Sequence, residues 1–153
     1  MKLKLYSDGA ARGNPGHSAI GVVINDFEGE LLEEFGEYIG EATNNEAEYA
    51  ALFSGVTAAK KYVPCSLEVF MDSELLVRQM SGQYKVKNEN LKIYHNNVRA
   101  ELKYFEKVVF RHIPREKNAR ADELANIAMD KALKSGNPTG NNLKKRTKQL
   151  DLF

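Results

Sequence analysis

Four carboxylates occupy positions where they could carry out metal-dependent chemistry. Asp8 and Asp72 each come at the end of a strand-like run of alternating residues. Glu48 and Asp122 fall near the starts of two helix-like segments, on faces that are otherwise apolar. A carboxylate aimed into a protein interior is costly unless positive charge compensates it. A pair of divalent cations would provide that charge, so the pattern favours phosphoryl-transfer chemistry.

Each carboxylate also has an ordinary structural explanation. Asp8 could be a turn residue before Gly9, and Asp72 could belong to a helix cap. Asp122 could simply favour a helix N-terminus, and Glu48 could extend to solvent. All four fall at one end of the predicted sheet, and this coincidence favours a site.

The pattern of the remaining residues predicts the elements that position these four. Strands are expected over residues 2–8, 19–25, 31–39, 67–71 and 108–113, and helices over 43–61, 74–80, 89–105 and 118–133, with a Gly/Pro/Asn-rich turn over 10–16. This order predicts an α/β fold whose five-stranded mixed sheet has three antiparallel strands joined by hairpins plus two parallel strands, flanked by helices. A right-handed crossover would place the first and fourth strands side by side, and Asp8 next to Asp72.

The helix expected over 43–61 begins with a capping box. Thr43 is the expected N-cap, and Glu46 is expected to reach back to its backbone. Glu48 has no such role. It shares a stripe, expected to face the sheet, with Leu52, Val56, Ala59 and Val63.

Composition indicates one ordinary globular domain. Residues 1–134 are expected to form it, and residues 135–153 to form a flexible basic tail. Residues 1–133 carry a net charge of −3 and the rest +4, so whole-chain charge gives no nucleic-acid signal. No apolar run approaches a membrane span, the strand-like N-terminus argues against a signal peptide, and a single cysteine fits a cytoplasmic protein. We expect a monomer.

Five segments together resemble the motifs of type 1 ribonuclease H in order and spacing. They are Tyr6-Ser7-Asp8-Gly9-Ala10, Gly13-Asn14-Pro15-Gly16, Thr43-Asn44-Asn45-Glu46-Ala47-Glu48, Met71-Asp72-Ser73 and Ala121-Asp122-Glu123-Leu124-Ala125. The resemblance covers residues 1–133. It implies a ribonuclease H-like fold and an endonuclease that cuts the RNA strand of RNA–DNA hybrids, leaving 5′-phosphate and 3′-hydroxyl ends.

The resemblance also implies roles for individual residues. Asp8, Glu48, Asp72 and Asp122 would hold two Mg²⁺ ions, with Mn²⁺ as the alternative metal. His112 resembles the family's mobile loop histidine, which is implied in proton transfer or product release; an edge-strand histidine is the structural alternative. The residues that match family contacts to the hybrid are Gly9, Asn14, Thr43, Asn44, Asn45 and Ser73.

Two features depart from the common family pattern. The basic, tryptophan-containing protrusion of many members is replaced by residues 82–88, and the chain has no tryptophan, which resembles the subgroup that lacks the protrusion. Glu74 stands where some members have an amide, and an extra carboxylate there could change metal affinity. His17 and His95 have no partner motif, and we expect both at the surface.

The last five residues resemble a second, independent motif. Gln149-Leu150-Asp151-Leu152-Phe153 is similar to the pentapeptide with which bacterial replication and repair proteins bind the DNA sliding clamp. The match implies a bacterial source. The alternative is that Leu152 and Phe153 fold back onto the domain.

Two other functional classes compete with the hybrid-specific nuclease. One is a non-catalytic module that binds hybrids and is recruited to a clamp; the intact set of four carboxylates argues against it. The other is a DNA-cutting relative with the same fold, such as a transposase or resolvase. A cleavage assay on hybrid, RNA duplex and DNA duplex would separate the three.

Overall fold

The computed structural model describes residues 1–136, which form a single sheet with helices on both faces. The strands are β1 (Lys2–Gly13), β2 (Gly16–Asp26), β3 (Leu31–Ala42), β4 (Ser66–Met71) and β5 (Val108–His112). The α-helices are α1 (Asn44–Ala59), α2 (Glu74–Met80), α3 (Glu89–Leu102) and α4 (Ala119–Lys134). Short 3₁₀ turns cover Lys60–Tyr62 and Arg115–Asn118.

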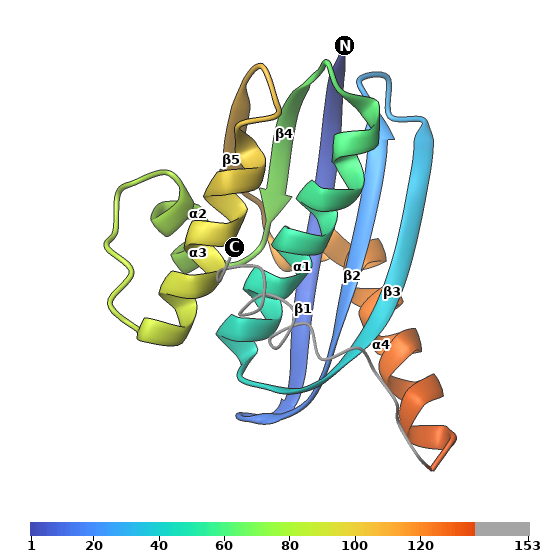
Figure 1. Ribbon diagram of the computed structural model, residues 1–153. Helices are drawn as coiled ribbons and strands as arrows, with labels where there is room; N and C mark the ends of the chain where they lie inside the picture. Colours follow the sequence, from blue (N-terminus) through green and yellow to red (C-terminus); the bar gives the residue numbers. More distant parts are fainter. Residues whose placement is uncertain (137–153) are drawn as a thin grey trace.

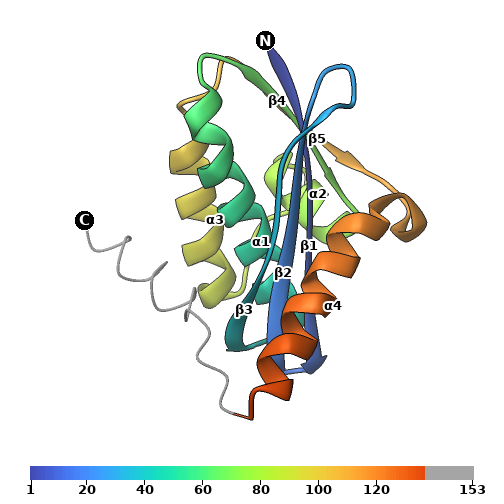
Figure 2. The same ribbon diagram turned by 90° about the vertical axis from the view of Figure 1, so that its right-hand side faces the viewer.

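The sheet has the expected five-stranded mixed topology, with strand order β3-β2-β1-β4-β5 (Figure 1). β1, β2 and β3 pair antiparallel, whereas β4 pairs parallel with both β1 and β5. The crossover through α1 therefore brings β1 and β4 together, as predicted. Figure 2 shows α1 and α3 on one face of the sheet and α4 on the other.

The first hairpin differs from the prediction. The expected turn over residues 10–16 is wrong, because β1 continues to Gly13 and pairs with β2 as far as Gly16. The backbones of Ala10 and Ala11 pair with β2, which their small side chains allow. The turn is therefore reduced to Asn14 and Pro15. Asp8 consequently lies inside a strand and not at its end.

Helix α1 forms the core with the sheet. Its capping box is confirmed, because Thr43 Oγ1 accepts from the Glu46 N–H and the Glu46 side chain accepts from the Thr43 N–H. The predicted inward stripe is buried at Leu52, Val56 and Ala59. It is wrong at Val63, which is 37% exposed because the α-helix ends at Ala59.

Helix α4 packs on the opposite face at very short range. A Cβ on Gly21 would lie 1.9 Å from the Ala121 carbonyl oxygen, and one on Gly36 would lie 2.2 Å from the Leu124 carbonyl oxygen. These two glycines therefore let the helix backbone approach β2 and β3 directly. Ala19, Ala125 and Met129 form a small core there.

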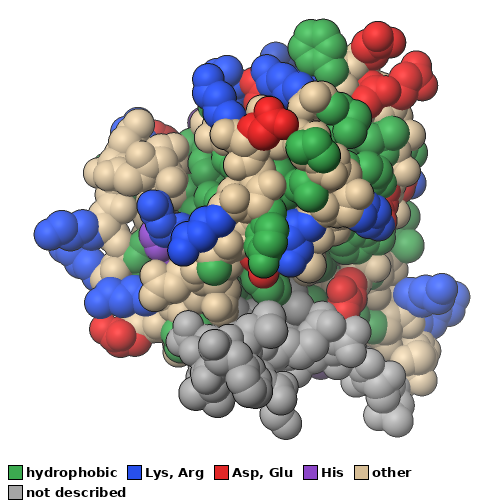
Figure 3. Space-filling view, turned by 45° about the horizontal axis from the view of Figure 1, so that its top comes forward, with side chains coloured by type: hydrophobic (Ala, Val, Ile, Leu, Met, Phe, Trp, Pro, Cys, Tyr) green, Lys and Arg blue, Asp and Glu red, His purple; other side chains and the backbone are tan. Residues whose placement is uncertain are grey.

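The end of the molecule that contains the N-terminus exposes both apolar and charged side chains. Met1, Phe27 and Leu31 are more than half exposed. Figure 3 shows apolar side chains on this face lying among acidic and basic ones. Within residues 1–136, none of the helices combines the length and apolar character that crossing a membrane requires.

Candidate active site

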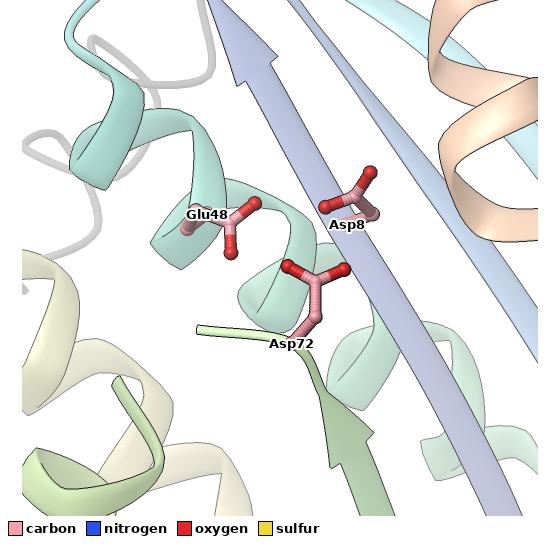
Figure 4. Close-up of side chains that lie close together, drawn as sticks. All are labelled: Asp8, Glu48 and Asp72. Carbon is pink, nitrogen blue, oxygen red and sulfur yellow. The ribbon is translucent and has the colours of Figure 1, made fainter. Parts of the chain in front are cut away.

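Three of the four predicted carboxylates form one compact acidic cluster. Asp8, Glu48 and Asp72 each offer an oxygen, and these atoms lie within 4.8 Å of one another. Figure 4 shows the three carboxylates pointing toward one another from β1, α1 and the end of β4. Segments separated by up to 64 positions thus converge on a site whose oxygen donors suit a hard divalent cation.

Strand pairing explains why Asp8 and Asp72 meet there. The parallel register of β1 and β4 ends at the pair Tyr6 and Phe70. Beyond this pair β4 stops at Met71, while β1 continues beside β2. Asp8 and Asp72 are each two residues past the last pair, so both lie at the carboxyl edge of the parallel strands, where sites form in such sheets.

Glu48 is held in place by the backbone of β1. Its Oε1 accepts a 2.7 Å hydrogen bond from the Gly9 N–H. A Cβ on Gly9 would lie 2.1 Å from the Ala47 carbonyl oxygen, so only glycine allows α1 to come this close. Gly9 itself is buried and its N–H is used inside the site.

Burial gives the cluster an unusual electrostatic character. Asp8 and Glu48 are each 6% exposed. Burial, reinforced by the neighbouring charges of Glu48 and Asp72, raises the pKa of Asp8 to about 10. Burial likewise raises the pKa of Glu48, to about 7, and the hydrogen bonds from Asp8 and Gly9 limit that rise. Without a cation, the raised pKa values favour the protonated forms of Asp8 and Glu48.

Asp122 approaches the cluster from the opposite face of the sheet. It sits in the first turn of α4, and its side chain lies within hydrogen-bonding reach of Asp8. It is outside the group of three whose oxygens are mutually close. Asn126 donates to its Oδ1 at 3.4 Å, and Arg115 lies 3.8 Å from it. Asp122 is thus next to Asp8 but more open to solvent.

A cation fits this donor set. Within residues 1–136, no lysine or arginine forms an ion pair with Asp8, Glu48 or Asp72; Arg115, which is mostly exposed, pairs with Asp122. Buried carboxylates without a basic partner are the arrangement that a divalent cation stabilises. The residues present could therefore hold a metal ion.

His112 lies beside the cluster but on a strand. It is the last residue of β5, is exposed, and its Nε2 is 3.3 Å from the Asp72 carbonyl oxygen. The structure thus places the imidazole at the rim of the site, on the edge strand that was the structural alternative.

Besides the acidic cluster, the structure has a pocket of about 420 Å³ at the N-termini of α1 and α3, which is lined mainly by amide side chains. Asn14, Thr43, Asn44 and Asn45, predicted to contact substrate, all line it, together with Asn88 and Asn90. Asn14 Oδ1 also accepts from the Asn44 N–H at 3.0 Å, which fastens the first hairpin to α1. The sequence pattern did not predict Asn88 and Asn90 as pocket residues. Two asparagines at the start of a helix were the feature that could have indicated this.

Ser73 and Glu74 have local partners on α2. Ser73 Oγ accepts from the Leu76 N–H, so this residue caps the helix. Glu74 forms an ion pair with Arg78 at 2.8 Å and does not join the acidic cluster.

The two histidines without a motif differ from each other. His17 is exposed and hydrogen-bonded to Tyr38, as expected for a surface residue. The surface assignment of His95 is wrong, because it is half-buried and packs edge-on against Tyr49. Its position on α3 faces α1, where aromatic side chains fill the gap between the helices.

Asn118 is a third residue that sequence reasoning missed. The sequence pattern predicts Asn118 as the first residue of the last helix, yet its side chain is buried and donates to the Ser7 carbonyl oxygen and to Asp72. These contacts span 111 and 46 positions in the sequence, which no local pattern reveals.

Comparison with known proteins assigns the class of this fold and site. The family described as reverse transcriptase-like matches residues 6–128. Ribonuclease H from Erythrobacter litoralis is 32% identical over 147 residues, covering 84% of this chain and 96% of the relative. The chain therefore belongs to the reverse transcriptase-like family and, within it, to the ribonucleases H.

Solved structures agree with this assignment. RNase H1 from the halophilic archaeon Halobacterium salinarum is 39% identical with a TM-score of 0.84, covering 86% of this chain and all of that one. LC11-RNase H1, solved in complex with an RNA/DNA hybrid, is 51% identical with a TM-score of 0.83, covering 86% and 99%. A bifunctional protein of Mycobacterium tuberculosis is 40% identical over 136 residues, and the chain spans only 37% of its length.

Proposed function

We propose that this protein hydrolyses the RNA strand of RNA–DNA hybrids, leaving 5′-phosphate and 3′-hydroxyl ends. The carrying observation is the mutual closeness of Asp8, Glu48 and Asp72, within 4.8 Å, with Asp122 beside Asp8. Relatives named ribonuclease H and a homologous structure bound to an RNA/DNA hybrid support the substrate class.

Two Mg²⁺ ions, or Mn²⁺ in their place, would be held by Asp8, Glu48, Asp72 and Asp122. When bound, such ions supply electrostatic stabilisation of the charge that develops during phosphoryl transfer. Asp8 belongs to the group of three and also interacts with Asp122, so it would be the residue shared between the two parts of the metal site. The protein's own contribution is a rigid frame, because Glu48 and Asp122 lie on helices, Asp8 lies within β1 and Asp72 directly follows β4.

Substrate binding would fall to the amide pocket at the N-termini of α1 and α3. Asn45 precedes Glu48 by three residues on α1, so the pocket and the cluster lie about one helical turn apart. Uncharged donors at helix N-termini suit phosphate oxygens, and the 2′-hydroxyl distinguishes RNA from DNA. A strand bound in the pocket could thus extend to the cluster.

His112 would act at the rim of the site. An exposed imidazole next to Asp72 is placed to act as a general acid or base. We propose this role, in proton transfer or product release, on the strength of that position.

Residues 82–88 between α2 and α3 would replace the basic protrusion of other family members. Arg78 lies over the Tyr84 ring at 5.3 Å and receives backbone hydrogen bonds from Gln83 and Tyr84, so the segment is fastened to α2. With fewer cations to meet phosphates, hybrid affinity should be modest. The pentapeptide at 149–153 lies outside the described residues; we propose that it binds a sliding clamp and raises the local concentration near DNA.

A cleavage assay tests the proposed function. Labelled RNA–DNA hybrid, RNA duplex and DNA duplex are incubated with the protein in Mg²⁺, in Mn²⁺ and in EDTA. Metal-dependent cutting of the RNA in the hybrid alone, with 5′-phosphate products, is the expected result. Tight hybrid binding without cutting in either metal would instead support a non-catalytic binding module.

A further inference from the structure

Asn118 occupies the junction between the 3₁₀ turn Arg115–Asn118 and α4, and its side chain points inward. The residue is 1% exposed, although the residues on either side of it are exposed. An asparagine directly before a helix usually caps it with its side-chain oxygen. Asn118 makes no such capping bond. Its side chain is therefore used for something other than the helix that it precedes.

The Asn118 amide group instead joins two strands. Its Nδ2 donates to the Ser7 carbonyl oxygen at 2.9 Å and to Asp72 Oδ2 at 3.0 Å. Ser7 directly precedes Asp8 on β1, and Asn118 itself lies one helical turn before Asp122. One side chain thus connects the three elements that carry Asp8, Asp72 and Asp122.

We propose that Asn118 is a positioning residue of the metal site, which orients the Asp72 carboxylate and sets the distance between α4 and the two strands. This inference rests on the proposed function, since it assigns a metal-holding role to the acidic cluster. Asn118 acts through Asp72 and need not touch the metal or the substrate. A carboxylate oxygen can accept more than one bond, so Asp72 remains able to act as a ligand.

The chemistry of an amide suits this place. A lysine or arginine would also donate to Asp72, but its charge would compete with a bound cation. An amide is uncharged, so it donates to Asp72 without repelling a cation. The Asn118 Oδ1 is buried without a hydrogen-bond partner among the described residues.

The test compares Asn118→Ala with Gln79→Ala. Gln79 is a matched control, because it is also a buried amide that bonds a side chain from another element, Tyr49, and is not bonded to any of the four carboxylates. Binding of Mn²⁺ and Mg²⁺ is measured by calorimetry on each folded protein without nucleic acid, alongside urea unfolding. Both variants should lose stability. Asn118→Ala should bind metal about tenfold more weakly, and Gln79→Ala should bind it as the wild type does.

Wild-type metal affinity in folded Asn118→Ala would overturn the proposal. Should that variant fail to fold, an NMR titration of the wild-type protein with Mg²⁺ decides. The Asn118 side-chain amide signal should shift and the Gln79 signal should stay, whereas an unmoved Asn118 signal contradicts the role. These measurements use no hybrid, so their outcome does not depend on the cleavage assay. A wild-type protein that binds metal but cuts no hybrid would refute the proposed function and not the role of Asn118.

Discussion

The Gly9 N–H and the Glu48 Oε1 form a 2.7 Å hydrogen bond that joins β1 to α1 at the acidic cluster. The bond exists because the two backbones approach more closely than any side chain at position 9 would permit. Glu48 is therefore positioned by main chain, which leaves its other oxygen for a ligand.

Gly9→Ala should damage both stability and the site. The new Cβ would collide with the Ala47 carbonyl, so α1 must move outward at a cost of about 1–3 kcal/mol. Glu48 would move with it, and metal affinity should fall. Gly55→Ala is the control, because the atoms nearest to its Cβ would be those of the Leu5 side chain in the core, and not those of the acidic cluster. Unfolding and metal titration of the two variants should separate them; equal metal affinity would contradict the proposed role of Gly9.

Asp8→Asn should remove activity while strengthening the fold. The central ligand is lost, so cleavage of the hybrid should fall by about 10³-fold or more. Repulsion in the cluster is also relieved, so the metal-free protein should gain about 1–2 kcal/mol in urea unfolding. Glu123→Gln, an exposed acid on α4, is the matched control and should keep wild-type activity. Substantial cleavage by Asp8→Asn would show that Asp8 is not a ligand.

The metal-free protein should lose stability as pH rises. The pKa values of Asp8 and Glu48 are raised in the folded state, to about 10 and about 7, so the folded protein holds more protons than the unfolded chain. Their contribution is present at low pH and is lost as pH rises through 7 toward 10. Urea unfolding in EDTA between pH 5.5 and 8.5 should show a decline of about 4 kcal/mol, because each extra proton held by the folded state costs about 1.4 kcal/mol per pH unit.

Two controls accompany this pH series. Mg²⁺ should restore stability most at the alkaline end, because ligands bind metal when deprotonated. Asp8→Asn should flatten the curve. Stability in EDTA that rises with pH would mean that the cluster does not hold protons.

Asn90→Ala should weaken substrate binding without slowing chemistry. Loss of one donor from the amide pocket is worth about 1 kcal/mol, which predicts a rise in KM of about fivefold with unchanged kcat. Asn96→Ala makes the same change at an exposed position on the same helix, outside this pocket. The measurement is steady-state kinetics on a hybrid. The same KM for both variants would show that the pocket does not bind the substrate.

Deleting residues 149–153 should abolish binding to a bacterial sliding clamp and leave hybrid cleavage nearly unchanged. Leu152 and Phe153 would supply the apolar contacts, so Phe153→Ala alone should weaken binding strongly. Surface plasmon resonance with immobilised clamp measures this, and Lys148→Ala serves as the neighbouring control. Unchanged clamp affinity after the deletion would eliminate the docking role.

The adjacency of Asp8 and Asp72 was predictable because it follows from topology. Once the first and fourth strands are parallel neighbours, their carboxyl ends must meet, and the side chains there must meet too. The capping box at Thr43 was equally accessible, since its partners are three residues apart.

Contacts that depend on exact backbone approach were not predictable. The first hairpin is tighter than its Gly/Pro/Asn composition suggests, because small residues such as Ala10 allow pairing to continue. His95 is half-buried because Tyr49 faces it from another helix. Asn118 looked like a helix start, and only the assembled fold brings Ser7 and Asp72 to its amide.

The seating of α4 on Gly21 and Gly36 has a consequence for engineering. Main-chain contact sets the distance between α4 and the sheet. The core side chains between α1 and the opposite face of the sheet therefore do not determine where Asp122 lies. Substitutions in the core between α1 and the sheet could accordingly raise the melting temperature without moving Asp122. The reverse also holds: a single methyl group added at either glycine would lift one wall of the site.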